Sequence, residues 1–136
     1  MDPRLGEYLK AAASRPFVWG GPDCATFPAD WILTLDPTAP DPMGALRGAY
    51  GDQSRAAVLI ARAGGLQELW TLNCGAAGLT RRRGRAAPGD IGLCWFLGQA
   101  GPLLAGAVSL GRGRWAALTP TGLLIGPARP KAVWRI

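Results

Sequence analysis

The sequence contains no histidine, and its 136 residues include only nine acidic residues and three cysteines. The absence of histidine excludes a mixed Cys/His metal site and a cysteine–histidine catalytic pair within this chain. The cysteines, Cys24, Cys74 and Cys94, are odd in number and widely separated, which fits neither a disulfide framework nor zinc-binding cysteine pairs. We therefore expect three free thiols, no metal and no cofactor.

Long apolar runs are also absent. No segment approaches the run of about 20 apolar residues that a membrane span needs, and the first ten residues contain no apolar signal-peptide core. We therefore expect no membrane contact and no export by a standard signal. Hydrophobic residues make up 49% of the chain, which excludes a disordered protein, and the length predicts one domain over residues 1–136.

Acidic residues are outnumbered by 15 basic ones, which gives a net charge of +6. The arginines are scattered except in the run Arg81-Arg82-Arg83-Gly84-Arg85. Such a run is usually a solvated loop, and no aromatic interleaving or nucleic-acid-binding motif accompanies it. Nucleic-acid binding is therefore the least supported of the functions considered.

The first half of the chain has helical spacing. Residues 3–14 predict a helix capped by Asp2, and residues 24–35 predict a second with Cys24 in its first turn. Pro28 is tolerated only near a helix start, so a start near Thr26 is the alternative. A short turn at 43–47 and helices at 52–63 and 66–72 follow.

The second half predicts strands. Short apolar segments at 91–97, 103–110, 114–118, 122–125 and 132–136 are separated by turn residues, which indicates an antiparallel meander. Helices followed by strands predict an α+β fold, in which the N-terminal helices pack on a C-terminal antiparallel β-sheet.

Cys24 follows a turn rich in glycine and proline. A cysteine at a helix N-terminus has a lowered pKa, and Asp23 is placed to cap that helix. Cys24 and Asp23 are thus the candidate catalytic residues. The alternative is that Cys24 is a small buried hydrophobe and Asp23 only a cap.

Trp19-Gly20-Gly21 followed by Asp23-Cys24 resembles the nucleophile motif of the NlpC/P60 superfamily of cell-wall cysteine peptidases. The stretch is closer still to short NlpC/P60-like proteins of phage-tail and gene-transfer-agent clusters, the DUF6950 type, which read Ala-Trp-Gly-x-x-Asp-Cys before an Ala-Asp helix. An Arg-Gly-x-Tyr segment ending at Tyr50 also occurs in those proteins. The resemblance implies a minimal papain-like fold.

The resemblance fails at the general base. In NlpC/P60 enzymes the second strand after a Pro-Gly-Asp turn opens with His-Val-Gly-Ile-Tyr-Leu-Gly, whereas this chain reads Ala105-Gly106-Ala107-Val108-Ser109-Leu110-Gly111. Ala105 takes the place of the histidine, and alanine neither activates a thiol nor protonates a leaving amine. The expected cleft has Trp19 and Gly20 on one side, with Ala105 and an exposed Ser109 on the facing strand.

Two functions follow from this comparison. The first is a non-enzymatic structural component of a phage or gene-transfer-agent tail, in the virion near the tail tip, hub or baseplate, with other tail proteins as partners. The second is a peptidoglycan hydrolase in which Cys24 is the nucleophile, Asp23 assists, and another subunit supplies the base.

Overall fold

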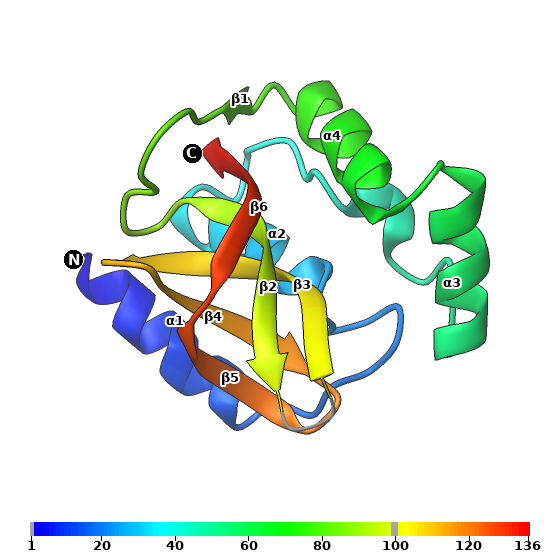
Figure 1. Ribbon diagram of the computed structural model, residues 1–136, viewed down its shortest axis with the longest axis horizontal. Helices are drawn as coiled ribbons and strands as arrows, with labels where there is room; N and C mark the ends of the chain where they lie inside the picture. Colours follow the sequence, from blue (N-terminus) through cyan, green and yellow to red (C-terminus); the bar gives the residue numbers. More distant parts are fainter. Residues whose placement is uncertain (1, 99–100) are drawn as a thin grey trace.

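The computed structural model describes residues 2–98 and 101–136, and in this part of the chain four α-helices precede a six-stranded antiparallel sheet (Figure 1). The helices are α1 (Pro3–Ala13), α2 (Thr26–Leu35), α3 (Gln53–Arg62) and α4 (Leu66–Ala76), with a 3₁₀ turn at Gly44–Leu46. The strands are β1 (Thr80–Arg81), β2 (Ile91–Gly98), β3 (Gly101–Gly111), β4 (Arg114–Thr119), β5 (Gly122–Pro127) and β6 (Arg129–Arg135). The predicted α+β class is confirmed.

Helix α1 lies against α2, as its apolar spacing predicts. The Asp2 side chain accepts a hydrogen bond from the Arg4 amide at 2.8 Å, which caps the helix start. Tyr8 is buried, and its ring lies 5.1 Å from that of Phe27 and 5.6 Å from that of Trp31. These contacts fix α2 between α1 and the sheet.

The last strand departs from the predicted meander. Strands β2 to β5 follow one another in the sheet, but β6 returns to the far side of β2, and β1 pairs with β6. Burial explains the placement of β6, because Ala132, Val133 and Trp134 bury side chains on both faces and so need cover on both. Strand β1 lies in the segment predicted to be an arginine-rich loop, and the predicted turn between β2 and β3 includes residues 99–100, which lie outside the described residues.

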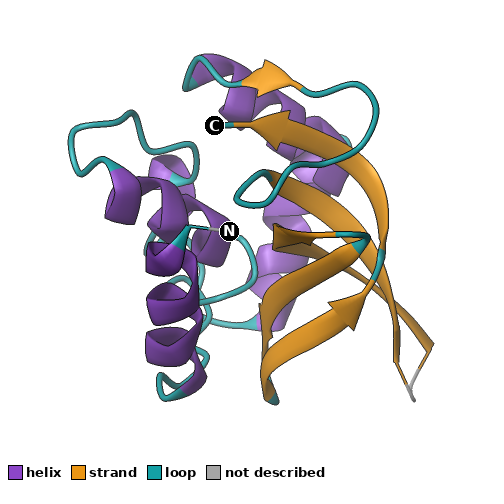
Figure 2. Cartoon of the chain, turned by 90° about the vertical axis from the view of Figure 1, so that its left-hand side faces the viewer, coloured by secondary structure: helices purple, strands orange, loops and turns teal. Residues whose placement is uncertain are grey.

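The sheet is strongly curved, and both of its faces are buried (Figure 2). The face toward the helices carries the larger core, with Trp31, Trp70 and Trp134 among its members. The opposite face carries a second cluster, which we call the inner cluster and which consists of Cys94, Phe96, Ala105, Ala107, Trp115, Ala117 and Val133. No helix in the described residues is long and apolar enough to cross a membrane.

Candidate functional site

Helix α2 begins at Thr26, which is the alternative start predicted from Pro28, and Cys24 lies in the turn before the helix rather than in its first turn. Asp23 and Thr26 cap the start reciprocally, because the Asp23 Oδ1 accepts from the Thr26 amide and the Thr26 Oγ1 accepts from the Asp23 amide, both at 2.9 Å. The capping role predicted for Asp23 is confirmed. The later start places Pro28 at the third helical position, where its missing amide costs no helical hydrogen bond.

The Asp23 carboxylate is fully buried and is held by neutral donors. Its Oδ1 also accepts from the Ala25 amide at 2.9 Å, and its Oδ2 accepts from the Gly20 amide at 3.0 Å and the Tyr50 hydroxyl at 2.6 Å. Burial, followed by the contact with Asp23, raises the pKa of Tyr50, so its hydroxyl keeps its proton. Asp23 therefore ties three separate segments together.

Gly20 allows two of these segments to meet. Its φ is +80°, and a Cβ at this position would lie 2.0 Å from the Tyr50 carbonyl oxygen. The Gly48 amide donates to the Gly20 carbonyl at 2.8 Å and closes the contact. Trp19, beside it, is half-buried with its ring edge-on to Phe17 at 4.8 Å.

Cys24 lies where the sheet opens between β3 and β4. These strands pair only from Val108 to Gly111, so Gly106 lies beyond their pairing, and its backbone amide is one of the groups that lower the Cys24 pKa. A Cβ on Gly106 would lie 2.4 Å from the Cys24 carbonyl oxygen and 2.5 Å from the Trp70 ring. The cysteine turn therefore fits against β3 only because residue 106 is glycine.

The pKa of the Cys24 thiol is raised to about 11, opposite to the lowering that a helix N-terminus predicts. Burial is the main cause and the neighbouring Asp23 carboxylate adds to it, while the amides of Cys24, Gly106 and Ala25 lower the pKa in part. All three cysteines are free, as expected, and burial raises the pKa of Cys74 and Cys94 to about 12.

Ala105, at the expected position of the histidine, is 1% exposed and belongs to the inner cluster. Cys24 packs against the same cluster, so the structure brings these two predicted site residues together. Ser109 is also buried, because the Gly89 amide and the Asp90 carbonyl bond its backbone, and the expectation that it is exposed is wrong. Its hydroxyl accepts from the Gly111 amide at 3.1 Å.

Asp90 forms a second buried carboxylate turn, before β2. It is 3% exposed, accepts from the Ala87 amide at 2.8 Å, and binds the Arg82 guanidinium through both oxygens. Arg82 belongs to the arginine run and also donates its backbone amide to Val133 at 2.8 Å. The Pro88-Gly89-Asp90 turn therefore sets the start of β2.

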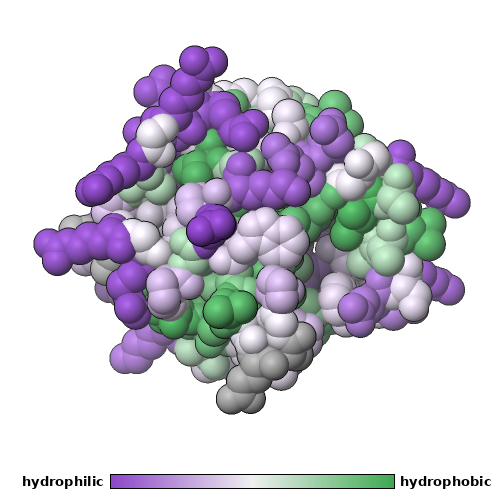
Figure 3. Space-filling view, viewed as in Figure 1, coloured by the Kyte–Doolittle hydropathy of each residue, from purple (hydrophilic) through white to green (hydrophobic). Residues whose placement is uncertain are grey.

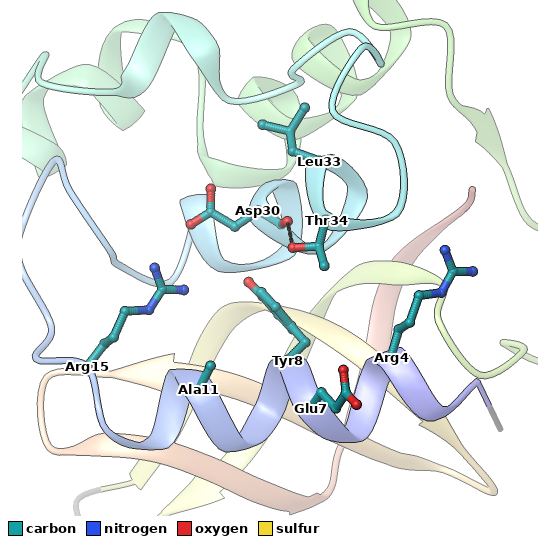
Figure 4. Close-up of a pocket in the computed structure, with 8 residues that line it drawn as sticks. All are labelled: Arg4, Glu7, Tyr8, Ala11, Arg15, Asp30, Leu33 and Thr34. Atoms are coloured by element: carbon teal, nitrogen blue, oxygen red, sulfur yellow. Dashed lines mark hydrogen bonds between the residues drawn. The ribbon is translucent and has the colours of Figure 1, made fainter.

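Three surface depressions of the structure are lined by residues other than Cys24. One lies between α1 and α2, where Tyr8 and Asp30 face each other across the groove and Thr34 donates to the Asp30 carbonyl at 2.8 Å (Figure 4). The Asp30 carboxylate forms an ion pair with Arg47 at 2.7 Å, so its negative charge is balanced within the protein. Within residues 2–98 and 101–136 no group of three or more Cys, Asp or Glu side chains is placed to hold a metal ion.

Taken together, these features define a small α+β domain whose Asp-Cys turn is built into the core between helix and sheet. The whole chain, residues 1–136, matches the family model described as a domain of unknown function, DUF6950, and the chain belongs to this family. No curated protein and no solved structure matches it.

Sequence reasoning identified Asp23, Cys24, Gly20 and Ala105 as site residues but gave Tyr50 no role in the site. The structure places the Tyr50 hydroxyl on the Asp23 carboxylate, 27 residues away in the chain. Its position in the Arg-Gly-x-Tyr segment, which the resemblance had already drawn attention to, was the signal available.

Proposed function

We propose that this protein is a structural component of a phage or gene-transfer-agent tail, in the tail-tip, hub or baseplate region, built on a catalytically degenerate NlpC/P60 cysteine-peptidase fold. The DUF6950 membership and the α+β architecture are compatible with this proposal. The resemblance of the Trp-Gly-Gly and Asp-Cys residues supplies the tail context and the relation to papain-like folds.

The observation that best supports a non-enzymatic role is that the Cys24 thiol is protonated at neutral pH. With a pKa of about 11, roughly one thiol in ten thousand is ionised at pH 7. A cysteine peptidase reacts through the thiolate, and a base beside the cysteine normally provides it. This chain has no histidine to act as that base.

The neighbours of Cys24 also support a structural role. Asp23 makes four hydrogen bonds to the fold and has no basic partner among its contacts, and Ala105 is enclosed among apolar side chains. A group already committed to four donors would have to give up fold contacts before accepting a proton from Cys24. General acid–base catalysis contributes about 10²–10⁴-fold, so its loss would leave at most slow hydrolysis.

One observation favours the alternative, a peptidoglycan hydrolase completed by another subunit. The backbone amides of Cys24, Gly106 and Ala25 each lower the pKa of the thiol, and amides placed in this way would stabilise a thiolate if a base reached it. In that case Cys24 would be the nucleophile and a neighbouring tail protein would supply the base.

Deletion of the gene in the strain that makes the particles tests the proposal. We expect the protein in purified particles by mass spectrometry, incomplete tails in the deletion by electron microscopy, and full rescue by Cys24→Ala. Absence from the particles together with normal tails in the deletion would refute the tail role. Complete tails and lost infectivity with Cys24→Ala, together with peptidoglycan turnover by the wild-type particles, would favour the hydrolase.

A further inference from the structure

Charge is divided unevenly between the two halves of the chain. Residues 1–76 carry six basic and eight acidic side chains, a net charge of −2, whereas residues 77–136 carry nine basic and one acidic, a net charge of +8. The one acid, Asp90, is buried against Arg82. The other eight cations are exposed, and no acid in the described part of this half is exposed with them.

Several of these cations gather where β5 turns into β6. The Ala128 amide between these strands donates to the Gly113 carbonyl at 3.2 Å, which places the β3–β4 turn beside this corner. A depression of about 790 Å³ opens here, and its lining includes Arg85, Arg112 and Pro130. The two arginines come from different loops, and neither forms an ion pair within the described residues.

An apolar depression of about 490 Å³ is lined by the residues that precede Pro130 in the same turn, Pro127, Ala128 and Arg129. Trp95, Leu97 and Pro127 line it together with Arg129, and Leu97 is 90% exposed. The Lys131 ammonium lies 5.9 Å from the Trp95 ring centroid. On the face that carries β6 and β2, hydrophobic patches lie among projecting hydrophilic side chains (Figure 3).

We name the two depressions together the corner surface. It consists of Arg85, Arg112, Arg129, Trp95 and Leu97, with Lys131 over the Trp95 ring. We propose that the corner surface docks an acidic segment of a partner protein that carries an apolar side chain. The arginines pair with carboxylates, and the apolar side chain fills the depression beside Trp95. Exposed arginine and tryptophan side chains around an apolar hollow are typical of the residues that dominate protein–protein binding.

Two other occupants fit less well. Nucleic acid would use the cations but not the apolar depression, and Lys131 already lies over the Trp95 ring on which a base would stack. A second copy of this chain fits less well, because its exposed acids lie singly on different elements, Glu7 on α1, Asp36 after α2, Asp52 before α3 and Glu68 on α4. The acids Asp30 and Asp41 are already bound to Arg47. The docking proposal does not depend on the ionisation of Cys24, and it can be tested independently of the proposed tail role.

The test uses the full chain and a fluorescently labelled synthetic peptide of glutamates around a central leucine, with a second peptide in which serine replaces the leucine. Fluorescence anisotropy titrations measure the affinity of each peptide at low salt and at physiological salt. We expect the leucine peptide to bind several-fold more tightly than the serine peptide, and salt to weaken both. Equal binding of the two peptides, or no binding at low salt, would overturn the proposal.

Charge-reversal pairs locate the site. The double variant Arg112→Glu/Arg129→Glu should lower the affinity for the leucine peptide at least tenfold. The matched double variant Arg55→Glu/Arg62→Glu on α3 should change this affinity less than threefold. Leu97→Ser, at an exposed position with little effect on folding, should remove the preference for leucine. Equal losses from the two pairs would show a net-charge effect and refute the site. Tighter binding of duplex DNA than of the peptide, or self-association that Arg112→Glu/Arg129→Glu abolishes and the α3 pair does not, would replace the proposed partner.

Discussion

Two turns in this protein bury an aspartate, and they hold it in opposite ways. Asp23 has only neutral donors, three backbone amides and the Tyr50 hydroxyl, and it is fully buried. Asp90 faces the Arg82 guanidinium, which is 29% exposed and keeps one side in water. The comparison shows that both carboxylates hold another part of the chain in place, Tyr50 in the first turn and Arg82 in the second, although only the second does so with an ion pair.

The largest expected effect is that of Asp23→Ala. It leaves four donors without an acceptor inside the fold, and we expect a loss of about 3–5 kcal/mol in the free energy of unfolding. Urea denaturation followed by tryptophan fluorescence measures it. Asp52→Ala removes the exposed cap of α3 and should cost about 1 kcal/mol. Equal losses would show that Asp23 is only a cap.

Gly20→Ala tests the close approach on which the Asp23 turn depends. A Cβ would lie 2.0 Å from the Tyr50 carbonyl oxygen at a φ of +80°, so we expect a loss of about 3 kcal/mol. In Gly6→Ala, within α1, nothing lies within 4 Å of the added Cβ, and a gain of up to about 1 kcal/mol is expected. Thermal unfolding of both variants compares them, and a neutral Gly20→Ala would contradict the described turn.

Asp90→Ala tests the second turn, in which the buried carboxylate is paired with Arg82. The freed Arg82 side chain is partly exposed and can be hydrated, so we expect a smaller loss of about 2 kcal/mol. High salt should lower the stability of the wild type slightly and that of Asp90→Ala less, because the ion pair is then already gone. Denaturation at two salt concentrations measures this difference. A loss as large as that of Asp23→Ala would remove the distinction between the two turns.

Tyr50→Phe gives the smallest change. It removes one of the four donors to Asp23 and should cost about 1.5 kcal/mol, because the three amides remain. Tyr8→Phe, which loses a bond to the Phe27 carbonyl, is the matched control and should cost about 1 kcal/mol. Chemical denaturation of the two variants side by side provides the comparison. An unchanged Tyr50→Phe protein would mean that the hydroxyl adds nothing to the turn.

Much of the fold was predictable because its signals are local. The Asp2 cap, the helical spacing of α1 and the turn residues around the strands each act within a few neighbours. The pairing of β6 with β2 was not predictable, because it depends on which distant surfaces cover Ala132 to Trp134. The same applies to β1, which is a strand only because β6 lies beside it.

The candidate site was predictable in its residues but not in their chemistry. The motif located Asp23, Cys24 and Ala105, and the structure brings Cys24 and Ala105 to one apolar cluster. The sign of the Cys24 pKa shift was wrong because burial of the thiol, to which the Asp23 carboxylate adds, is invisible in the spacing. Ser109 was misplaced for a similar reason, since its cover comes from the Asp90 turn.

The most direct test of the account is the pH dependence of Cys24 alkylation by iodoacetamide, resolved by peptide mass spectrometry. Cys74 and Cys94 report global unfolding in the same sample. A pKa of about 11 leaves the thiol protonated at neutral pH, so the Cys24 rate should rise about tenfold per pH unit from pH 7 to 10 without a plateau. A Cys24 rate that levels off near pH 6–7, with Cys74 and Cys94 unreactive, would show a stabilised thiolate and contradict the structural role.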